Sequence, residues 1–167
     1  MLLAQGYQES RLDQNVRSPV GAIGIMQVMP KTGQILGVGD IRKADANVHA
    51  GAKYIAQLMD VYFKGIPFDE QNRTLFGFAA YNTGPGKIKS LRREAEAQKL
   101  DPNVWFNNVE RVAAVRVGQE PVRYVRNIYK YYIAYKLIEE DEAADKAAIS
   151  AINTPVAPDA PTSTKSP

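Results

Sequence analysis

Cysteine is absent from the 167-residue sequence, and histidine occurs once, as His49. The lack of cysteine excludes disulfide bonds, thiolate catalysis and thiolate metal ligands. It leaves the redox compartment open, because a cysteine-free protein tolerates oxidising and reducing surroundings alike. A single histidine argues against a Ser-His-Asp triad and against a metal site with several histidines. We expect His49 to be a structural residue, hydrogen-bonded at the edge of the core.

Long apolar runs are also missing. No stretch reaches the roughly 18 apolar residues that a membrane-spanning helix needs, so we expect no transmembrane segment in this chain. The stretch after Met1 is not typical of a signal peptide, since it is short, lacks a basic flank and continues into the polar Gln5 and Gln8. The chain can therefore be a fragment whose export signal or membrane-attached part lies upstream.

Strong charge of one sign is lacking too. The formal net charge is +3 with a pI near 9.0, and the lysines and arginines are scattered along the chain. This balance suits an anionic polymer as a partner but falls short of a nucleic-acid-binding signature, so we expect no nucleic acid partner. With 45% hydrophobic residues, the chain is long enough for one domain with a substantial core.

Apolar residues recur at helical spacing along most of the chain. A proline or glycine marks several ends, such as Pro30 at a helix start and Gly37 to Gly39 after its end. We predict helices over residues 2–12, 30–36, 45–63, 69–82 and 87–100, and a last helix after Pro121. Asp45 is the predicted N-cap of its helix. Residues 101–120 look irregular, and the proline-rich stretch beyond about Asn153 looks disordered. No apolar–polar alternation is convincing, so the predicted fold class is all-α.

Glu9 is the carboxylate that merits attention first. It lies seven residues after Leu2 and three before Leu12, on or beside one helical face, so it should be partly desolvated. Desolvation disfavours the charged form and raises the pKa toward the value that a general acid needs at neutral pH. Most glutamates on amphipathic helices merely border the apolar face, so this pattern alone does not assign a catalytic role.

Three motifs occur in order along the chain: QES at residues 8–10, SPVGAIGIMQVMP at 18–30 and AAYNTGPG at 79–86. Together they resemble the catalytic domain of the soluble-type lytic transglycosylases. These enzymes have a lysozyme-like fold with a substrate groove and cleave the glycan strands of bacterial peptidoglycan. The resemblance extends through YVRNIYKYY at 124–132. That segment and the run around Glu110 look most similar to the membrane-bound lytic murein transglycosylase F branch.

The resemblance implies a reaction that needs one carboxylate and neither a metal nor another cofactor. Glu9 matches the family's catalytic residue. It would first protonate the glycosidic oxygen between N-acetylmuramic acid and N-acetylglucosamine, and the ionised Glu9 would then deprotonate the muramic acid 6-hydroxyl. The product is a 1,6-anhydro ring, formed without water by intramolecular attack at high effective molarity. The resemblance implies that the substrate's N-acetyl group assists, where an ordinary glycosidase would use a second carboxylate.

The family pattern also implies a set of substrate-binding residues. Hydroxyls and amides would hold the sugar substituents, and a thioether would pack on a ring face. The matched positions are Ser18, Gln27, Met29, Tyr81, Asn82, Glu110 and Tyr124. Tyr81 would hydrogen-bond either the reacting sugar or Glu9, and Glu110 matches a second, non-catalytic glutamate of the groove. Asp13, the only other carboxylate near Glu9 in sequence, falls at a structural position in the turn after the first helix.

The resemblance implies a catalytic domain over residues 1–140, followed at 141–167 by the end of the last helix and the proline-rich tail. The first helix looks truncated against the family. The F branch joins this domain to an upstream solute-binding-like domain, so a regulatory domain in the full-length protein is expected. The implied location is the periplasm or cell envelope, with attachment of the full-length protein to the outer membrane. Two alternatives stay open: a lysozyme-type hydrolase and a non-catalytic glycan-binding module.

Overall fold

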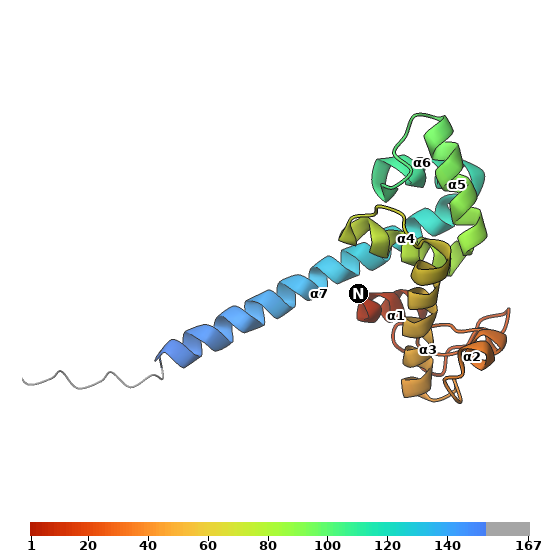
Figure 1. Cartoon of the computed structure of the whole chain (residues 1–167). Helices are drawn as coiled ribbons and strands as arrows, with labels where there is room; N and C mark the ends of the chain where they lie inside the picture. The colour runs from red at the N-terminus through yellow and green to blue at the C-terminus, as the bar shows by residue number, and fades with distance from the viewer. Residues whose placement is uncertain (153–167) are drawn as a thin grey trace, which may run out of the picture. The chain divides into compact units, whose positions relative to one another are not determined.

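A computed structural model describes residues 1–152 of the chain (Figure 1). Its elements are α1 (Leu2–Ser10), α2 (Pro30–Leu36), α3 (Ala44–Gln57), the π-helical turn η1 (Leu58–Tyr62), α4 (Glu70–Thr83), α5 (Pro85–Ala97), the π-helical turn η2 (Trp105–Val109), α6 (Glu110–Arg116) and α7 (Gln119–Ile152). Over these residues there is no β-strand, only isolated bridges that pair Ile23 with Arg17 and with Val28. The all-α prediction is confirmed.

Local capping signals explain where several helices begin and end. Pro30 opens α2, and Gly37, with φ of 64°, adopts the left-handed conformation that ends it, as predicted. The Asp69 carboxylate accepts a 2.6 Å hydrogen bond from the Asn72 backbone N–H at the start of α4. Pro85 likewise opens α5 directly after α4 ends.

Three predictions from the sequence are wrong. Lys43 is the N-cap residue of α3. Asp45 lies inside the first turn, where its negative charge interacts favourably with the positive end of the helix dipole. Within the stretch predicted to be irregular, residues 110–116 form α6, a helix of only seven residues and therefore too short to show a clear period. His49 is exposed rather than hydrogen-bonded at the edge of the core.

The core is centred on α4, which lies between α3 and α5 (Figure 1). Five consecutive or nearly consecutive side chains of α4 are at most 1% exposed: Leu75, Phe76, Phe78, Ala79 and Ala80. A helix buried around its circumference needs neighbours on several sides. The fully buried Trp105 supplies one of them, with its ring edge-on to Phe76 at 5.7 Å between centroids. The end of α4, which carries the AYN motif, is thereby fixed in position.

The chain divides into two units, residues 1–133 and 134–167. The first unit contains the elements from α1 to the first part of α7 and every candidate site residue. In the second unit α7 continues, with ion pairs between Lys136 and Glu140 and between Lys146 and Glu142. The predicted disordered tail lies outside the described residues. Among the described helices, none is long and apolar enough to cross a membrane.

Candidate active site

Glu9 lies in the last turn of α1, where the chain turns sharply. Arg11 and Leu12 both adopt left-handed backbone conformations, with φ of 58° and 65°. The Asp13 carboxylate then accepts a 2.8 Å hydrogen bond from the Asn15 backbone N–H. This arrangement agrees with the structural role that the sequence suggested for Asp13. The helix thus ends at Ser10, one residue after Glu9, and the turn that follows fixes the position of the Glu9 backbone.

The Glu9 carboxylate is held in a partly buried position between helices. Desolvation by burial raises its pKa to about 7, the nearby Glu120 carboxylate adds to the rise, and a hydrogen bond from the Tyr124 hydroxyl partly offsets it. The expectation of a raised pKa is confirmed. Its cause differs from the simple face argument, because Leu2 and Leu12 are each 39% exposed. The desolvation comes instead from the other helices that pack around Glu9.

Tyr124 joins α7 to α1 at this point, across 115 residues of sequence. Its side chain is 5% exposed, and its hydroxyl donates to Glu9 while accepting a 3.3 Å hydrogen bond from Nε2 of Gln5. Burial, followed by the charge of Glu9, raises the pKa of Tyr124 well above its usual value. The hydroxyl therefore keeps its proton and acts as a neutral hydrogen-bond partner of the carboxylate.

Tyr81, from α4, is the second tyrosine near Glu9. Burial raises its pKa, and the charge of Glu9 raises it further, which places the two groups within electrostatic reach. Its hydroxyl donates a 2.7 Å hydrogen bond to the backbone carbonyl of Met26 rather than to Glu9. The AYN motif and the GIMQ segment thus meet in space beside the carboxylate. A contact of Tyr81 with the sugar stays a prediction.

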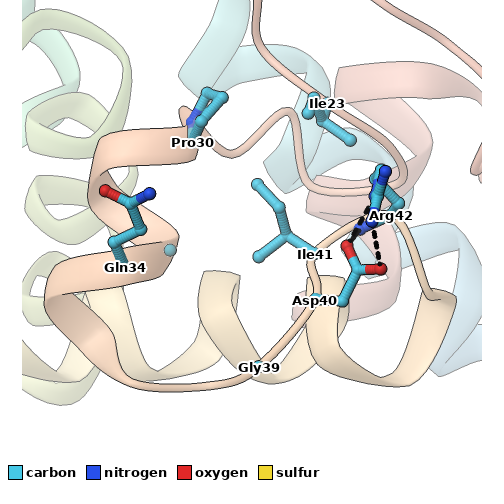
Figure 2. Close-up of a pocket in the computed structure, with 8 residues that line it drawn as sticks. Ile23, Pro30, Gln34, Gly39, Asp40, Ile41 and Arg42 are labelled. Atoms are coloured by element: carbon cyan, nitrogen blue, oxygen red, sulfur yellow. Dashed lines mark hydrogen bonds and ion pairs between the residues drawn. The ribbon is translucent and has the colours of Figure 1, made fainter.

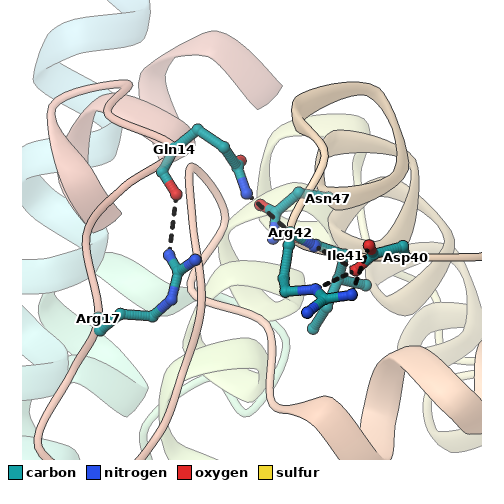
Figure 3. Close-up of polar contacts among 6 residues, drawn as sticks. All are labelled: Gln14, Arg17, Asp40, Ile41, Arg42 and Asn47. Carbon is teal, nitrogen blue, oxygen red and sulfur yellow. Dashed lines mark hydrogen bonds and ion pairs between the residues drawn. The ribbon is translucent and has the colours of Figure 1, made fainter.

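Buried amides position the loop of residues 21–30. Asn47 donates to the carbonyls of Ile23 and Ile41, and its oxygen accepts a 2.7 Å bond from the Met26 N–H. Gln14 accepts from the Ile25 N–H and donates to the Ile41 carbonyl, as Figure 3 shows for the Gln14, Ile41 and Asn47 group. Ile23 and Val28 pair through two backbone hydrogen bonds, and the two amide side chains satisfy the Met26 and Ile25 N–H groups and the Ile23 carbonyl around that pair.

Gln27 and Met29 line a hollow of about 130 Å³ next to Tyr81. The lining residues are Gln27, Val28, Met29, Thr32, Tyr54 and Tyr81. Gln27 adopts φ of 46°, and its amide donates to the Gly24 carbonyl at 2.8 Å, which fixes the side chain against the loop. Met29 is 41% exposed, so its thioether is accessible from solvent. Both residues stand where a sugar ring could lie, and their binding role stays a prediction.

Ser18 and Asn82 make structural contacts near the same region. The Ser18 hydroxyl accepts a 3.0 Å hydrogen bond from the Ala22 N–H and helps to close the loop. The Asn82 side-chain amide donates to the Glu120 carboxylate at 2.8 Å and joins the end of α4 to the start of α7. Asn82 therefore holds the carboxylate whose charge acts on Glu9.

Glu110 is buried, with 7% of its surface exposed, and both of its oxygens have partners. Arg126 donates to one oxygen at 2.8 Å, and the Asn107 N–H donates to the other at 3.1 Å. No contact links it to Glu9 within the described residues. A direct role of Glu110 in substrate binding stays a prediction.

Two site residues escaped the sequence analysis as functional candidates. Gln5 is fully buried against Tyr124, and Glu120 stands close enough to Glu9 to raise its pKa. A polar residue inside the apolar run of α1 was a signal for Gln5. Glu120 lies four residues before Tyr124, one helical turn away. The sequence of α7 alone does not indicate that Glu120 comes close to Glu9 of α1.

A second hollow, of about 250 Å³, lies beside α2 and does not include Glu9 or its partners (Figure 2). Ile41 points into it, and Asp40 and Arg42 form an ion pair of 2.8 Å at its edge. The Arg42 guanidinium lowers the pKa of Asp40 to about 2. In the described part of the chain, no group of three or more histidine, aspartate or glutamate side chains could hold a metal ion.

Comparison of the sequence with known proteins identifies the same family. The sequence model described as Transglycosylase SLT domain matches residues 1–104. A membrane-bound lytic murein transglycosylase F from Ectopseudomonas mendocina is 34% identical over 146 residues, covering 79% of this chain and 29% of the relative. The same-named protein of Pseudomonas fluorescens is 32% identical over 87% of this chain and 33% of its own length.

A third relative, membrane-bound lytic murein transglycosylase F 1 from Alkalilimnicola ehrlichii, is 33% identical over 96% of this chain and 35% of its own length. The chain thus spans about a third of the length of the curated relatives that it matches. The family match ends at residue 104, whereas the relatives' alignments are long enough to include much of the remaining chain.

Proposed function

Because the chain belongs to the transglycosylase SLT domain family, we propose that it is a peptidoglycan lytic transglycosylase with Glu9 as its catalytic residue. The enzyme cleaves the β-1,4 bond between N-acetylmuramic acid and N-acetylglucosamine and leaves a 1,6-anhydro end. One observation carries the proposal: Glu9 is partly buried and has a pKa of about 7. At neutral pH it is divided between the two protonation states that an acid and then a base require.

In the first step Glu9 is protonated and gives its proton to the glycosidic oxygen. The leaving N-acetylglucosamine end takes this proton as the bond to the anomeric carbon breaks. Tyr124 and Tyr81 stay neutral throughout, because burial and the charge of Glu9 raise the pKa of both. The reacting proton is therefore that of Glu9.

In the second step the ionised Glu9 takes the proton of the muramic acid 6-hydroxyl, whose oxygen bonds to the anomeric carbon. The Tyr124 hydroxyl supports this state by donating to the carboxylate. The 6-hydroxyl belongs to the same sugar, so its attack is intramolecular and competes well with water. Glu9 ends the cycle protonated again and ready for the next bond.

The side chains near Tyr81 and its hollow position the substrate. We assign the sugar substituents to the polar groups of Ser18, Gln27 and Asn82, and a ring face to the thioether of Met29. Tyr81 and Tyr124 flank the reacting sugar, and Glu110 lies further along the groove. The exposure of Met29 supports this assignment, since a sugar ring would cover it.

Hydrolysis is the competing reaction that one observation favours. Glu120 supplies a second carboxylate near Glu9, and a glycosidase can use such a group to activate water. Its oxygen already accepts from Asn82, which supports a positioning role instead. The reaction product distinguishes the two possibilities.

The substrate and location follow from the same proposal. The partner is the glycan strand of peptidoglycan, an anionic polymer that suits the formal charge of +3. The relatives are named membrane-bound, so we place the activity at the bacterial cell envelope, in the periplasm, with attachment of the full-length protein to the outer membrane. We assign the catalytic domain to residues 1–140, and the greater length of the relatives supports an additional regulatory domain.

The test is digestion of purified sacculi followed by mass analysis of the soluble products. We expect anhydro-muropeptides from the wild-type chain and none from Glu9→Gln, which keeps the shape of the side chain but cannot exchange the proton. Products with reducing ends alone would indicate a lysozyme-type hydrolase. Binding to sacculi without soluble products would indicate a glycan-binding module. Either result would overturn the proposal.

A further inference from the structure

Gln5 is a buried polar side chain with an incomplete set of partners. It is 0% exposed, and its Nε2 donates one hydrogen bond, of 3.3 Å, to the Tyr124 hydroxyl. Its Oε1 atom is buried and has no hydrogen-bond partner. An unsatisfied buried carbonyl is costly, and an apolar side chain of similar size would avoid that cost. Gln5 lies one helical turn before Glu9, on the same face of α1.

The two states of Glu9 make opposite demands on Tyr124. The ionised carboxylate can only accept, so the Tyr124 hydroxyl must donate to it and is left with its oxygen free to accept. The protonated carboxyl can donate to the Tyr124 oxygen, which frees the Tyr124 proton for another acceptor. A side-chain amide offers a donor at one end and an acceptor at the other, so Gln5 can complete either arrangement.

We propose that Gln5 is a positioning residue whose amide orients the Tyr124 hydroxyl and reverses its own orientation when Glu9 changes protonation state. With Glu9 ionised, the chain runs from Gln5 Nε2–H to Tyr124 and from Tyr124 O–H to Glu9, as in the structure. With Glu9 protonated, the chain runs from Glu9 O–H to Tyr124 and from Tyr124 O–H to Gln5 Oε1. The unpartnered oxygen is the acceptor held for the second state.

The effect of Gln5 on kcat rests on the proposed function, whereas the hydrogen-bonded chain from Gln5 to Glu9 does not. The groups that face Glu9 are Tyr124 and Glu120 from α7 and Tyr81 from α4. Tyr81 donates to the Met26 carbonyl and Glu120 accepts from Asn82, so both have partners of their own. Tyr124 is therefore the group through which a buried amide can act on Glu9.

The first test is Gln5→Met, a change that keeps the volume and removes both polar atoms. We expect kcat to fall about tenfold, the effect of one lost hydrogen bond in the transition state, with KM unchanged because Gln5 cannot reach substrate. The pKa of Glu9 should rise, because the charged state gains more from the hydrogen-bonded chain than the neutral state does. The thermal midpoint should not fall, because an unsatisfied buried atom is removed with the lost bond.

The matched control is Gln5→Met in a Tyr124→Phe background. Without the hydroxyl, the amide has nothing to orient, so the second change should lower kcat no further and leave the pKa of Glu9 where Tyr124→Phe sets it. A loss of the same size in both backgrounds would overturn the proposal. So would a folded Gln5→Met protein with wild-type kcat and an unchanged Glu9 pKa.

A measurement on the wild-type chain covers the case in which Gln5→Met does not fold. The side-chain amide resonances of Gln5 should titrate with the same midpoint as the Glu9 carboxyl carbon, because the amide changes partner atom with that proton. Resonances that do not respond across the Glu9 midpoint would overturn the inference. This titration needs no substrate, so failure of the enzyme to form anhydro products would count against the proposed function alone.

Discussion

The Tyr81 hydroxyl donates a 2.7 Å hydrogen bond to the backbone carbonyl of Met26 and thereby ties α4 to the loop of residues 21–30. Both groups are largely buried, and Met26 is 1% exposed. The Met26 N–H donates to the Asn47 side chain. The backbone N–H and carbonyl of Met26 are therefore both hydrogen-bonded to side chains of helices, Asn47 of α3 and Tyr81 of α4. The loop beside Glu9 is thus held by tertiary contacts.

Tyr81→Phe should therefore reduce stability as well as activity. It removes a hydrogen bond and leaves the Met26 carbonyl unsatisfied, at a cost of about 1–2 kcal/mol. For a domain of this size that lowers the thermal midpoint by about 2–4 °C for each kcal/mol. Tyr62→Phe is the matched control, since Tyr62 is 40% exposed and should change stability by less than about 0.5 kcal/mol. Equal midpoints for the two variants would contradict the buried role of the Tyr81 hydroxyl.

The sequence predicted the helices whose ends carry strong local signals and missed the features that depend on distant contacts. Pro30 and Gly37 define α2 from neighbouring residues alone. By contrast, α6 follows a turn in which Asn107 adopts φ of 60°, a conformation that no periodicity indicates. The motifs pointed to Glu9 and Tyr124 separately, but their hydrogen bond joins residues 115 positions apart. Burial by other helices, not the face of α1, sets the pKa of Glu9.

Glu9 should destabilise the folded protein at neutral and higher pH. Folding raises its pKa from 4.5 to about 7, so the unfolded chain binds fewer protons between these values and stability falls as pH rises through them. Once pH exceeds the folded pKa, the cost is roughly 3 kcal/mol. Glu9→Gln should thus raise the thermal midpoint above pH 7 and leave it unchanged below pH 4.5, whereas Glu96→Gln, at an exposed site, should change neither. A Glu9→Gln midpoint equal to wild type at pH 8 would contradict the raised pKa.

The Glu120 carboxylate should control the pH range of the reaction. Its charge raises the pKa of Glu9, so Glu120→Gln should lower that pKa and move the alkaline limb of the kcat/KM profile to lower pH. The glutamine oxygen can still accept from Asn82, which keeps the junction between α4 and α7. Because Glu120 is exposed, the difference between variant and wild type should shrink at 1 M salt, where the Debye length is about 3 Å. Loss of all cleavage would instead indicate that Glu120 takes part in the chemistry.

Glu110 has two candidate roles that a pair of variants can separate. If Glu110 binds substrate in addition to pairing with Arg126, Glu110→Gln should raise KM about tenfold, the effect of one lost charged hydrogen bond. Arg126→Met should leave KM near wild type and lower stability by about 1 kcal/mol, because the Arg126 side chain is 62% exposed and solvent screens the pair. Equal KM values for wild type and Glu110→Gln would restrict Glu110 to its structural ion pair.

Gly51 of α3 should be intolerant of even one methyl group. A Cβ added there would lie 2.8 Å from the Cβ and 2.7 Å from the Cε of Met26, in a fully packed part of the core. Gly51→Ala must displace Met26 and should cost about 1–3 kcal/mol. Because the Met26 carbonyl accepts from Tyr81, the displacement should also reduce the rate of sacculus digestion.

Gly86 in α5 supplies the control for this substitution. An added Cβ there would meet open space, so Gly86→Ala should leave activity intact and stabilise the helix by up to about 1 kcal/mol. The thermal midpoint should therefore fall for Gly51→Ala and rise for Gly86→Ala. The digestion rate should fall for Gly51→Ala and stay at the wild-type value for Gly86→Ala. A Gly51→Ala protein that melts at or above the wild-type midpoint would show that Met26 can move aside freely. In that case the site loop would be less rigidly packed than its contacts indicate.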